Sequence, residues 1–225
     1  SNSFFTNYML RWCLKFAVRL SDETGALHIS ESERSKWGEV SDNVFLPWMT
    51  VGGVSIPEEF EGYSRLPDVK LRQRVVEGVQ FLDDGERSAA DGLENFSSKL
   101  VKQADVILLM SLFPDDFSLD VKIAAFDFYE PRTTHESSLS YGPHAVVAAD
   151  INKIERSAEF ISRGSRYDLD FSPATNYSNG VHLSAYAGAW QGVVEGLAGL
   201  RIREDCLTLS PKLPEGWEEY RFRLC

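Results

Sequence analysis

The sequence is poor in the residues that mark disulfide-bonded, metal-binding or nucleic-acid-binding proteins. It has three cysteines in 225 residues, and neither they nor the four histidines show a metal-ligand spacing. We therefore expect free thiols in a reducing compartment and no metal site. Lys and Arg total 23 against 34 Asp and Glu, and the net charge of −11 is unfavourable for binding nucleic-acid phosphates.

Long apolar runs and several nucleotide or nucleophile motifs are also missing. The longest apolar candidate, residues 106–113, is about half of the ~18 residues that a membrane span needs. No basic segment followed by an apolar one opens the chain, so the sequence predicts no signal peptide, no membrane partner and a cytoplasmic location. The absence of Gly-x-Gly-x-x-Gly, Gly-Lys-Ser and Gly-x-Ser-x-Gly argues against a phosphate loop or a nucleophile elbow.

Apolar residues recur at helical spacing through most of the chain. This pattern predicts helices over 4–20, 32–45, 97–113, 118–129, 143–151, 153–163 and 180–200. The last of these carries many small residues, so we expect it in a crowded centre. We predict an irregular loop over 47–68, helix or loop over 69–96, and strands over 200–202, 206–209 and 220–224. Because an apolar stripe starts almost at residue 1, we expect the chain to begin inside a larger fold.

Two polar segments and one histidine are candidates for a ligand site. Lys102 and Gln103 offer several donors and one acceptor, which suits vicinal sugar hydroxyls as well as a solvated helix start. Residues 132–140 hold five hydroxyls, a guanidinium and an imidazole, a pattern that fits an anionic ligand or an ordinary capping loop. His182 opens the small-residue helix, where a structural role is the more common one.

These segments resemble glycoside hydrolase family 65, the maltose, trehalose and kojibiose phosphorylases. The shared motifs are Lys-Gln-Ala-Asp-Val at 102–106, Phe-Pro-Asp-Asp-Phe at 113–117 and Tyr-Glu-Pro-Arg-Thr-Thr-His-Glu-Ser-Ser-Leu-Ser at 129–140. Further blocks lie at 5–9, 180–190 and 213–217. The resemblance implies an all-α fold, the second half of an (α/α)6 barrel over 1–200, followed over 201–225 by the first strands of a small C-terminal β-sandwich.

The resemblance also implies an activity, inverting phosphorolysis of an α-glucosyl disaccharide to glucose 1-phosphate and a sugar. It assigns Lys102 and Gln103 to the glucosyl group, and Ser137, Ser138 and His182 to phosphate. Inorganic phosphate is then a co-substrate, and no cofactor is expected. The loop around the phosphate would be shaped by Arg132, Thr134, His135 and Glu136.

The resemblance places the general-acid Glu upstream of Ser1, so no residue of this chain is assigned that role. We accordingly expect the N-terminal half of the same domain as a partner, and a homodimer is possible. Glu136 replaces the family's usual Asp, which keeps open an inverting α-glucoside or trehalose hydrolase of the same fold. A third alternative is a non-catalytic sugar-binding fragment.

Overall fold

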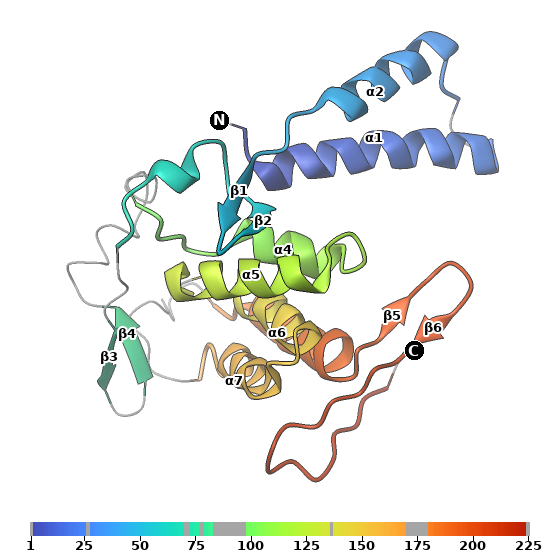
Figure 1. Ribbon diagram of the computed structural model, residues 1–225. Helices are drawn as coiled ribbons and strands as arrows, with labels where there is room; N and C mark the ends of the chain where they lie inside the picture. Colours follow the sequence, from blue (N-terminus) through green and yellow to red (C-terminus); the bar gives the residue numbers. More distant parts are fainter. Residues whose placement is uncertain are drawn as a thin grey trace. The chain divides into compact units, whose positions relative to one another are not determined.

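The computed structural model describes residues 2–25, 28–69, 73–76, 79–82, 98–135, 137–169 and 180–223. These residues form seven α-helices and three two-stranded antiparallel sheets (Figure 1). In the same ranges, no helix combines the length and the apolar character that crossing a membrane requires. The chain divides into two compact units, Ser1–Arg65 and Leu66–Cys225.

The first unit opens with two helices whose ends are set by local capping. Helix α1 (Phe4–Thr24) begins where the Ser3 side chain accepts a hydrogen bond from the Thr6 backbone, and it ends at Gly25, whose φ is 62°. Helix α2 (Glu31–Asn43) begins with a capping box between Ser30 and Glu33. Both helices were predicted, and α1 extends further than expected because only Gly25 provides a left-handed stop.

The irregular loop predicted over 47–68 is wrong. Strands β1 (Trp48–Val51) and β2 (Val54–Pro57) pair antiparallel through a turn at Gly52 and Gly53, and the short 3-10 helix η1 (Tyr63–Arg65) follows. Both turn glycines have positive φ, 56° and 86°, which is the geometry of a tight hairpin turn. The Gly-Gly pair was therefore a hairpin signal, and the flanking prolines lie at the strand ends.

The described residues of the second unit form two short hairpins and five helices. The first hairpin pairs β3 (Gln73–Val76) with β4 (Val79–Leu82), where the sequence predicted helix or loop. The remaining residues of 69–96 from 83 onward lie outside the described part of the chain. The helices are α4 (Asp105–Leu112), α5 (Leu119–Tyr129), α6 (Tyr141–Asp150), α7 (Ile154–Ser165) and α8 (Leu183–Gln191).

Helix α4 is much shorter than the predicted helix over 97–113. Val101 forms a parallel bridge with Thr133, and this extended pairing replaces the expected first turns. The start of α5 follows the prediction, since Ser118 caps it by accepting from the Val121 backbone.

Helix α6 lies in the crowded centre of this unit, and most of its residues are buried. It meets α8 at Gly142 and Gly188, where a β-carbon built on Gly142 would lie 2.6 Å from the Gly188 α-carbon. The prediction that the small-residue helix packs closely is therefore confirmed. That helix is not continuous over 180–200, because α8 passes into a π-helical turn, η5 (Gly192–Leu197).

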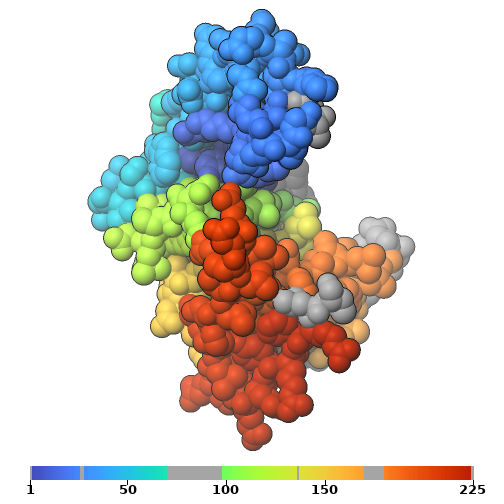
Figure 2. Space-filling model, turned by 90° about the vertical axis from the view of Figure 1, so that its right-hand side faces the viewer, coloured from blue at the N-terminus to red at the C-terminus, as the bar shows by residue number. Residues whose placement is uncertain are grey.

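The segment after residue 200 forms a short hairpin of β5 (Arg201–Ile202) and β6 (Leu207–Thr208). Figure 2 shows this segment in red on one face of the second unit. Residues 220–223 are not in a strand of the described part, so the strand predicted over 220–224 is not found there.

One carboxylate ties this segment to the helices. Asp150, at the end of α6, accepts from Lys122 Nζ on α5 at 2.9 Å and from an Arg201 guanidinium nitrogen at 2.5 Å. Lys212 donates to the Ala149 carbonyl at the same helix end. These cations also complement the negative end of the α6 dipole.

Candidate functional site

Two segments that lie far apart in the sequence run side by side at the start of α4. The Val101 backbone donates to the Arg132 carbonyl, and the Thr134 backbone donates to the Val101 carbonyl, both at 2.9 Å. This pairing brings the predicted sugar-binding pair next to the Ser- and Thr-rich loop. Lys102 is exposed there, whereas Gln103 is half-buried at a small pocket.

Arg132 anchors the beginning of the loop. Its guanidinium forms a two-nitrogen ion pair with Asp68, donates to the Phe128 carbonyl at 2.7 Å and lies 4.1 Å from the centre of the Phe128 ring. The hydrogen bond and charge of Arg132 lower the pKa of Asp68. These contacts with Asp68 and Phe128 hold the guanidinium of Arg132 against the protein and fix the start of the loop.

A buried cluster of two histidines follows the loop. His135, whose φ is 57°, makes a 2.9 Å hydrogen bond between its Nδ1 and Ser140 Oγ. His144 on α6 uses its Nδ1 to donate to the Ser140 carbonyl at 2.8 Å. In the described part of the chain, three buried atoms of this cluster have no hydrogen-bond partner: Thr134 Oγ1, His135 Nε2 and His144 Nε2. Both imidazole rings are thus hydrogen-bonded to Ser140.

Burial keeps both imidazoles neutral. Loss of hydration lowers the pKa of His144 to about 4, opposed by its bond to the Ser140 carbonyl and assisted by the charge of Arg156. Burial lowers the pKa of His135 well below its usual value, and His144 and Arg156 act in the same direction.

Acidification should therefore destabilise the fold through these rings. A histidine with a lowered folded-state pKa contributes stability above its unfolded pKa of ~6.5 and loses it as pH falls toward the folded value. For His144 alone we expect the free energy of unfolding to drop by about 1.5 kcal/mol between pH 6.5 and 5. Urea unfolding across this range measures it, and a stability that is flat with pH would contradict the buried, neutral assignment.

The serines after the histidine connect the loop to α8. Ser138 Oγ lies 2.8 Å from Ser184 Oγ, in the first turn of α8. Ser137 stays close by, since its carbonyl accepts from the Ser140 backbone at 3.0 Å. His182 is the residue immediately before α8. Ser138 and His182 therefore lie at the N-terminal end of α8, whose dipole favours an anion, and Ser137 directly precedes Ser138 in the loop.

A carboxylate that the sequence did not reveal orients His182. Asp168 accepts from the His182 backbone N–H at 2.8 Å and contacts His182 Nδ1 at 2.6 Å. Burial opposes ionisation of Asp168, yet the hydrogen bonds from His182 and Tyr186 leave its pKa lowered. The Tyr167 ring packs edge-on against the imidazole, 5.0 Å between ring centres. With Nδ1 held by Asp168, the opposite ring nitrogen of His182 is the one left for a ligand.

Some predicted features lie beyond what the structure describes. Glu136, the residue behind the hydrolase alternative, lies outside the described residues. In the ranges that are described, no group of three or more His, Cys, Asp or Glu is arranged to hold a metal ion.

The sequence analysis did not identify three residues that the structure places at the site, Asp168, Ser184 and His144. Of these three, only His144 could have been identified from the sequence, because it follows Ser140 by four residues at the start of a predicted helix.

These features define a helical domain whose loops gather hydroxyl, amide and imidazole groups around a helix N-terminus. Residues 1–191 match the model of the glycosyl hydrolase family 65 central catalytic domain, and residues 200–225 match that of the family's C-terminal domain. The chain belongs to glycosyl hydrolase family 65, which confirms the resemblance drawn from its motifs.

Individual relatives agree with this assignment. A kojibiose phosphorylase of Halothermothrix orenii is 30% identical and a maltose phosphorylase of Bacillus subtilis is 31% identical, each over 100% of this chain and 29% of its own length. A solved structure from the human microbiome that carries the name of a kojibiose phosphorylase has a TM-score of 0.77 at 25% identity, over 96% of this chain and 30% of that one. The chain thus spans about 30% of the length of these relatives.

Proposed function

We propose that this chain supplies the sugar- and phosphate-binding side of an inverting disaccharide phosphorylase. The reaction would transfer an α-glucosyl group from a disaccharide to inorganic phosphate, giving glucose 1-phosphate and a free sugar. The observation that carries the proposal is the 2.8 Å contact between Ser138 and Ser184, because it joins the serine loop to the helix start that follows His182. The family membership supports the same class of reaction.

The proposal gives each group a role in an inverting displacement. Lys102 and Gln103 would bind hydroxyls of the glucosyl group, while Ser137, Ser138 and His182 would hold phosphate for attack on the anomeric carbon. Attack by a bound anion needs no carboxylate to activate water. A carboxylic acid must still protonate the leaving oxygen, and we place that Glu in a segment outside this sequence.

The proposal includes the architecture that this chemistry needs. Residues 1–200 would form the second half of an (α/α)6 barrel and residues 201–225 the start of a β-sandwich, with the first half of the barrel completing the site. Phosphate would be the co-substrate, without a further cofactor. The cytoplasmic location and a homodimer remain predictions.

Phosphate binding tests the proposal directly. Ser138→Ala and His182→Ala should each weaken binding of inorganic phosphate by about tenfold or more, since each removes a hydrogen bond to a charged ligand. Calorimetric titration of the chain with phosphate measures this. Ser165→Ala, in a serine of α7 whose hydroxyl donates to the Ser162 carbonyl of the same helix, is the matched control and should leave the affinity unchanged. Equal affinity in all four proteins would refute the phosphate site.

A second measurement separates the alternatives. A polypeptide that includes this chain and the general acid should release glucose 1-phosphate from an α-glucosyl disaccharide only when phosphate is present. Release of glucose without phosphate would favour the hydrolase, and Glu136→Gln should then abolish it. Sugar binding without turnover in either condition would favour the non-catalytic alternative.

A further inference from the structure

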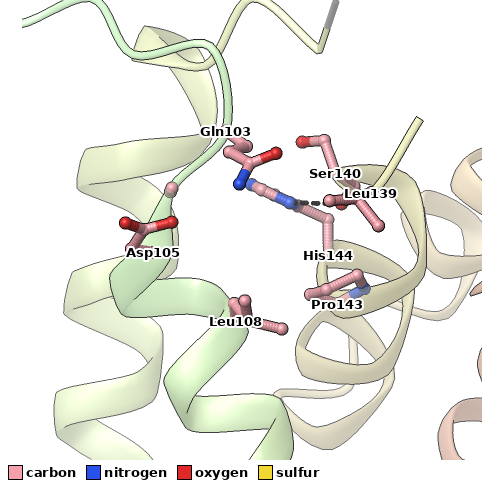
Figure 3. A pocket seen from close by; sticks show the side chains of 8 residues that line it. Gln103, Asp105, Leu108, Leu139, Ser140, Pro143 and His144 are labelled. Carbon is pink, nitrogen blue, oxygen red and sulfur yellow. Dashed lines mark hydrogen bonds between the residues drawn. The ribbon is translucent and has the colours of Figure 1, made fainter. Parts of the chain in front are cut away.

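Three imidazoles belong to the candidate site, and the Nδ1 of each is bonded to another residue of the protein. His135 and His144 are bonded to Ser140, and His182 is bonded to Asp168. The rings of His135 and His144 are buried, and the pocket beside His144 measures about 10 Å³, enough for one water-sized group (Figure 3). The side chain of His182 is 28% exposed. Of these three rings, His182 is therefore the one that an anion of the size of phosphate can reach.

The bond to Asp168 fixes which nitrogen of the His182 ring carries a hydrogen. Burial opposes ionisation of Asp168, but the hydrogen bonds that it accepts leave its pKa lowered, so the group is a carboxylate at neutral pH. A carboxylate only accepts, so the 2.6 Å contact between its Oδ1 and His182 Nδ1 requires the hydrogen on Nδ1. In the neutral imidazole the other nitrogen, Nε2, is then an acceptor without a hydrogen of its own.

Two further contacts keep the His182 ring in this orientation. The second carboxylate oxygen of Asp168 accepts from the His182 backbone N–H at 2.8 Å, so both oxygens are engaged by one residue. The Tyr167 ring packs against the imidazole at an angle of 67° between the ring planes. A half-turn of the imidazole would bring a ring carbon to Asp168 and break the Nδ1 hydrogen bond. The acceptor Nε2 is therefore held on the far side of the ring from Asp168.

The groups at the start of α8 differ in what they offer to an anion. The hydroxyls of Ser138 and Ser184 lie 2.8 Å apart, and a hydroxyl can donate as well as accept. His182 Nε2 can only accept, so its lone pair repels an anion whose oxygens carry no hydrogen, such as sulfate. Hydrogenphosphate, the main form of inorganic phosphate above neutral pH, has one P–OH group that can donate to such an acceptor.

We propose that His182, positioned by Asp168, accepts the P–OH hydrogen of hydrogenphosphate through Nε2, so that the site takes phosphate and rejects sulfate. The phosphate oxygens without a hydrogen are then left for the serine hydroxyls and for attack on the anomeric carbon. Asp168 is a positioning residue, because it acts on the anion only through the ring. That phosphate is the ligand rests on the proposed function, whereas the preference over sulfate is a separate claim.

The first test measures the preference in the wild-type chain. Calorimetric titrations with sodium phosphate and with sodium sulfate are compared at about pH 8, where an imidazole is ordinarily neutral. We expect phosphate to bind at least about tenfold more tightly, because sulfate loses the hydrogen bond and faces the Nε2 lone pair. Equal affinities for the two anions would overturn this inference and leave the phosphate site intact. A chain that binds no phosphate would refute the proposed function, and this inference with it.

The second test exchanges the hydrogens between Asp168 and His182. In Asp168→Asn the amide oxygen can keep the bond from the His182 backbone N–H, which turns the NH2 group toward Nδ1. Nδ1 then accepts and the ring hydrogen moves to Nε2, as the same substitution causes in the Ser–His–Asp triad. We expect the ratio of phosphate to sulfate affinity to fall about tenfold or more. A structural loss would weaken both anions alike, so an unchanged ratio would overturn the positioning role.

A matched substitution and a direct reading of the ring complete the test. Asp127→Asn, in an exposed carboxylate of α5 that pairs with Lys153, should leave the affinity ratio unchanged. Nuclear magnetic resonance of the 15N-labelled wild-type chain reads the ring of His182 even if Asp168→Asn does not fold. We expect the hydrogen on Nδ1, and an Nε2 signal that moves to the position of a hydrogen-bonded acceptor when phosphate is added. A hydrogen on Nε2, with or without phosphate, would overturn the proposal.

Discussion

Asp150→Asn is expected to lower the free energy of unfolding by about 3–5 kcal/mol, because it removes the only carboxylate in the described structure that pairs with Lys122 and Arg201. The Lys122 side chain is 9% exposed and that of Arg201 is 16% exposed. Neither cation can recover its hydration without a change in packing. The asparagine keeps the shape and one acceptor oxygen of the aspartate but not its charge. The loss of unfolding free energy therefore measures the cost of two buried cations without a counter-charge, not the cost of a cavity.

The control is a carboxylate that pairs with lysine at the surface. Asp127 binds Lys153, and the two side chains are 52% and 42% exposed. Asp127→Asn should cost less than ~1 kcal/mol, as exposed ion pairs usually do. Thermal and urea unfolding of both variants give the comparison. Similar losses in the two variants would show that the Asp150 cluster is hydrated and does not stabilise the fold in the way proposed here.

Gly142→Val should destabilise the fold by about 3 kcal/mol, because the crossing of α6 and α8 has no room for a side chain. The first added carbon would lie 2.6 Å from the Gly188 α-carbon and 3.1 Å from its carbonyl oxygen. These are backbone atoms, so no rotamer change relieves the contact and the helices themselves must separate. Circular dichroism should still report a helical protein, with a lower midpoint of thermal unfolding.

The matched control is a helical glycine with open space around it. A β-carbon at Gly38 in α2 would have no neighbouring atom within 4 Å. Gly38→Val should change stability by less than ~0.5 kcal/mol, since glycine and valine are both poor helix formers. A stable Gly142→Val protein would mean that the two helices do not touch at Gly188.

The helices were predictable from the sequence because their apolar spacing, caps and stops are local signals. Ser118 and Pro131 delimit α5 as expected, and the small residues of α8 indicated close packing. The extended stretch before α4 was not predictable, because its conformation depends on pairing between Val101 and Thr133, which are 32 positions apart in the sequence. The β1–β2 hairpin was missed for a different reason: its Gly-Gly turn was read as general loop composition.

The residues of the candidate site likewise fall into those that the sequence indicated and those that only the folded structure revealed. The motifs indicated Ser137, Ser138 and His182 as candidate site residues, whereas the spacing of residues in the sequence contained no information on Asp168 or Ser184. Their roles arise from where the chain returns after α7, a matter of tertiary packing. His144 shows the opposite case, since its position one helical turn after Ser140 is evident from the sequence, whereas its lowered pKa arises mainly from burial in the folded chain.

The glycine contact between α6 and α8 also bears on the spacing of the proposed phosphate-binding groups. Ser184 lies one helical turn before Gly188 in α8, and Ser138 lies in the turn that leads into α6, four residues before Gly142. The close approach of α6 and α8 at the two glycines therefore brings the turn before α6 near the start of α8, where the two hydroxyls meet. A side chain at either glycine would push the two helices apart, so we expect it to lengthen the Ser138–Ser184 contact as well as to destabilise the fold.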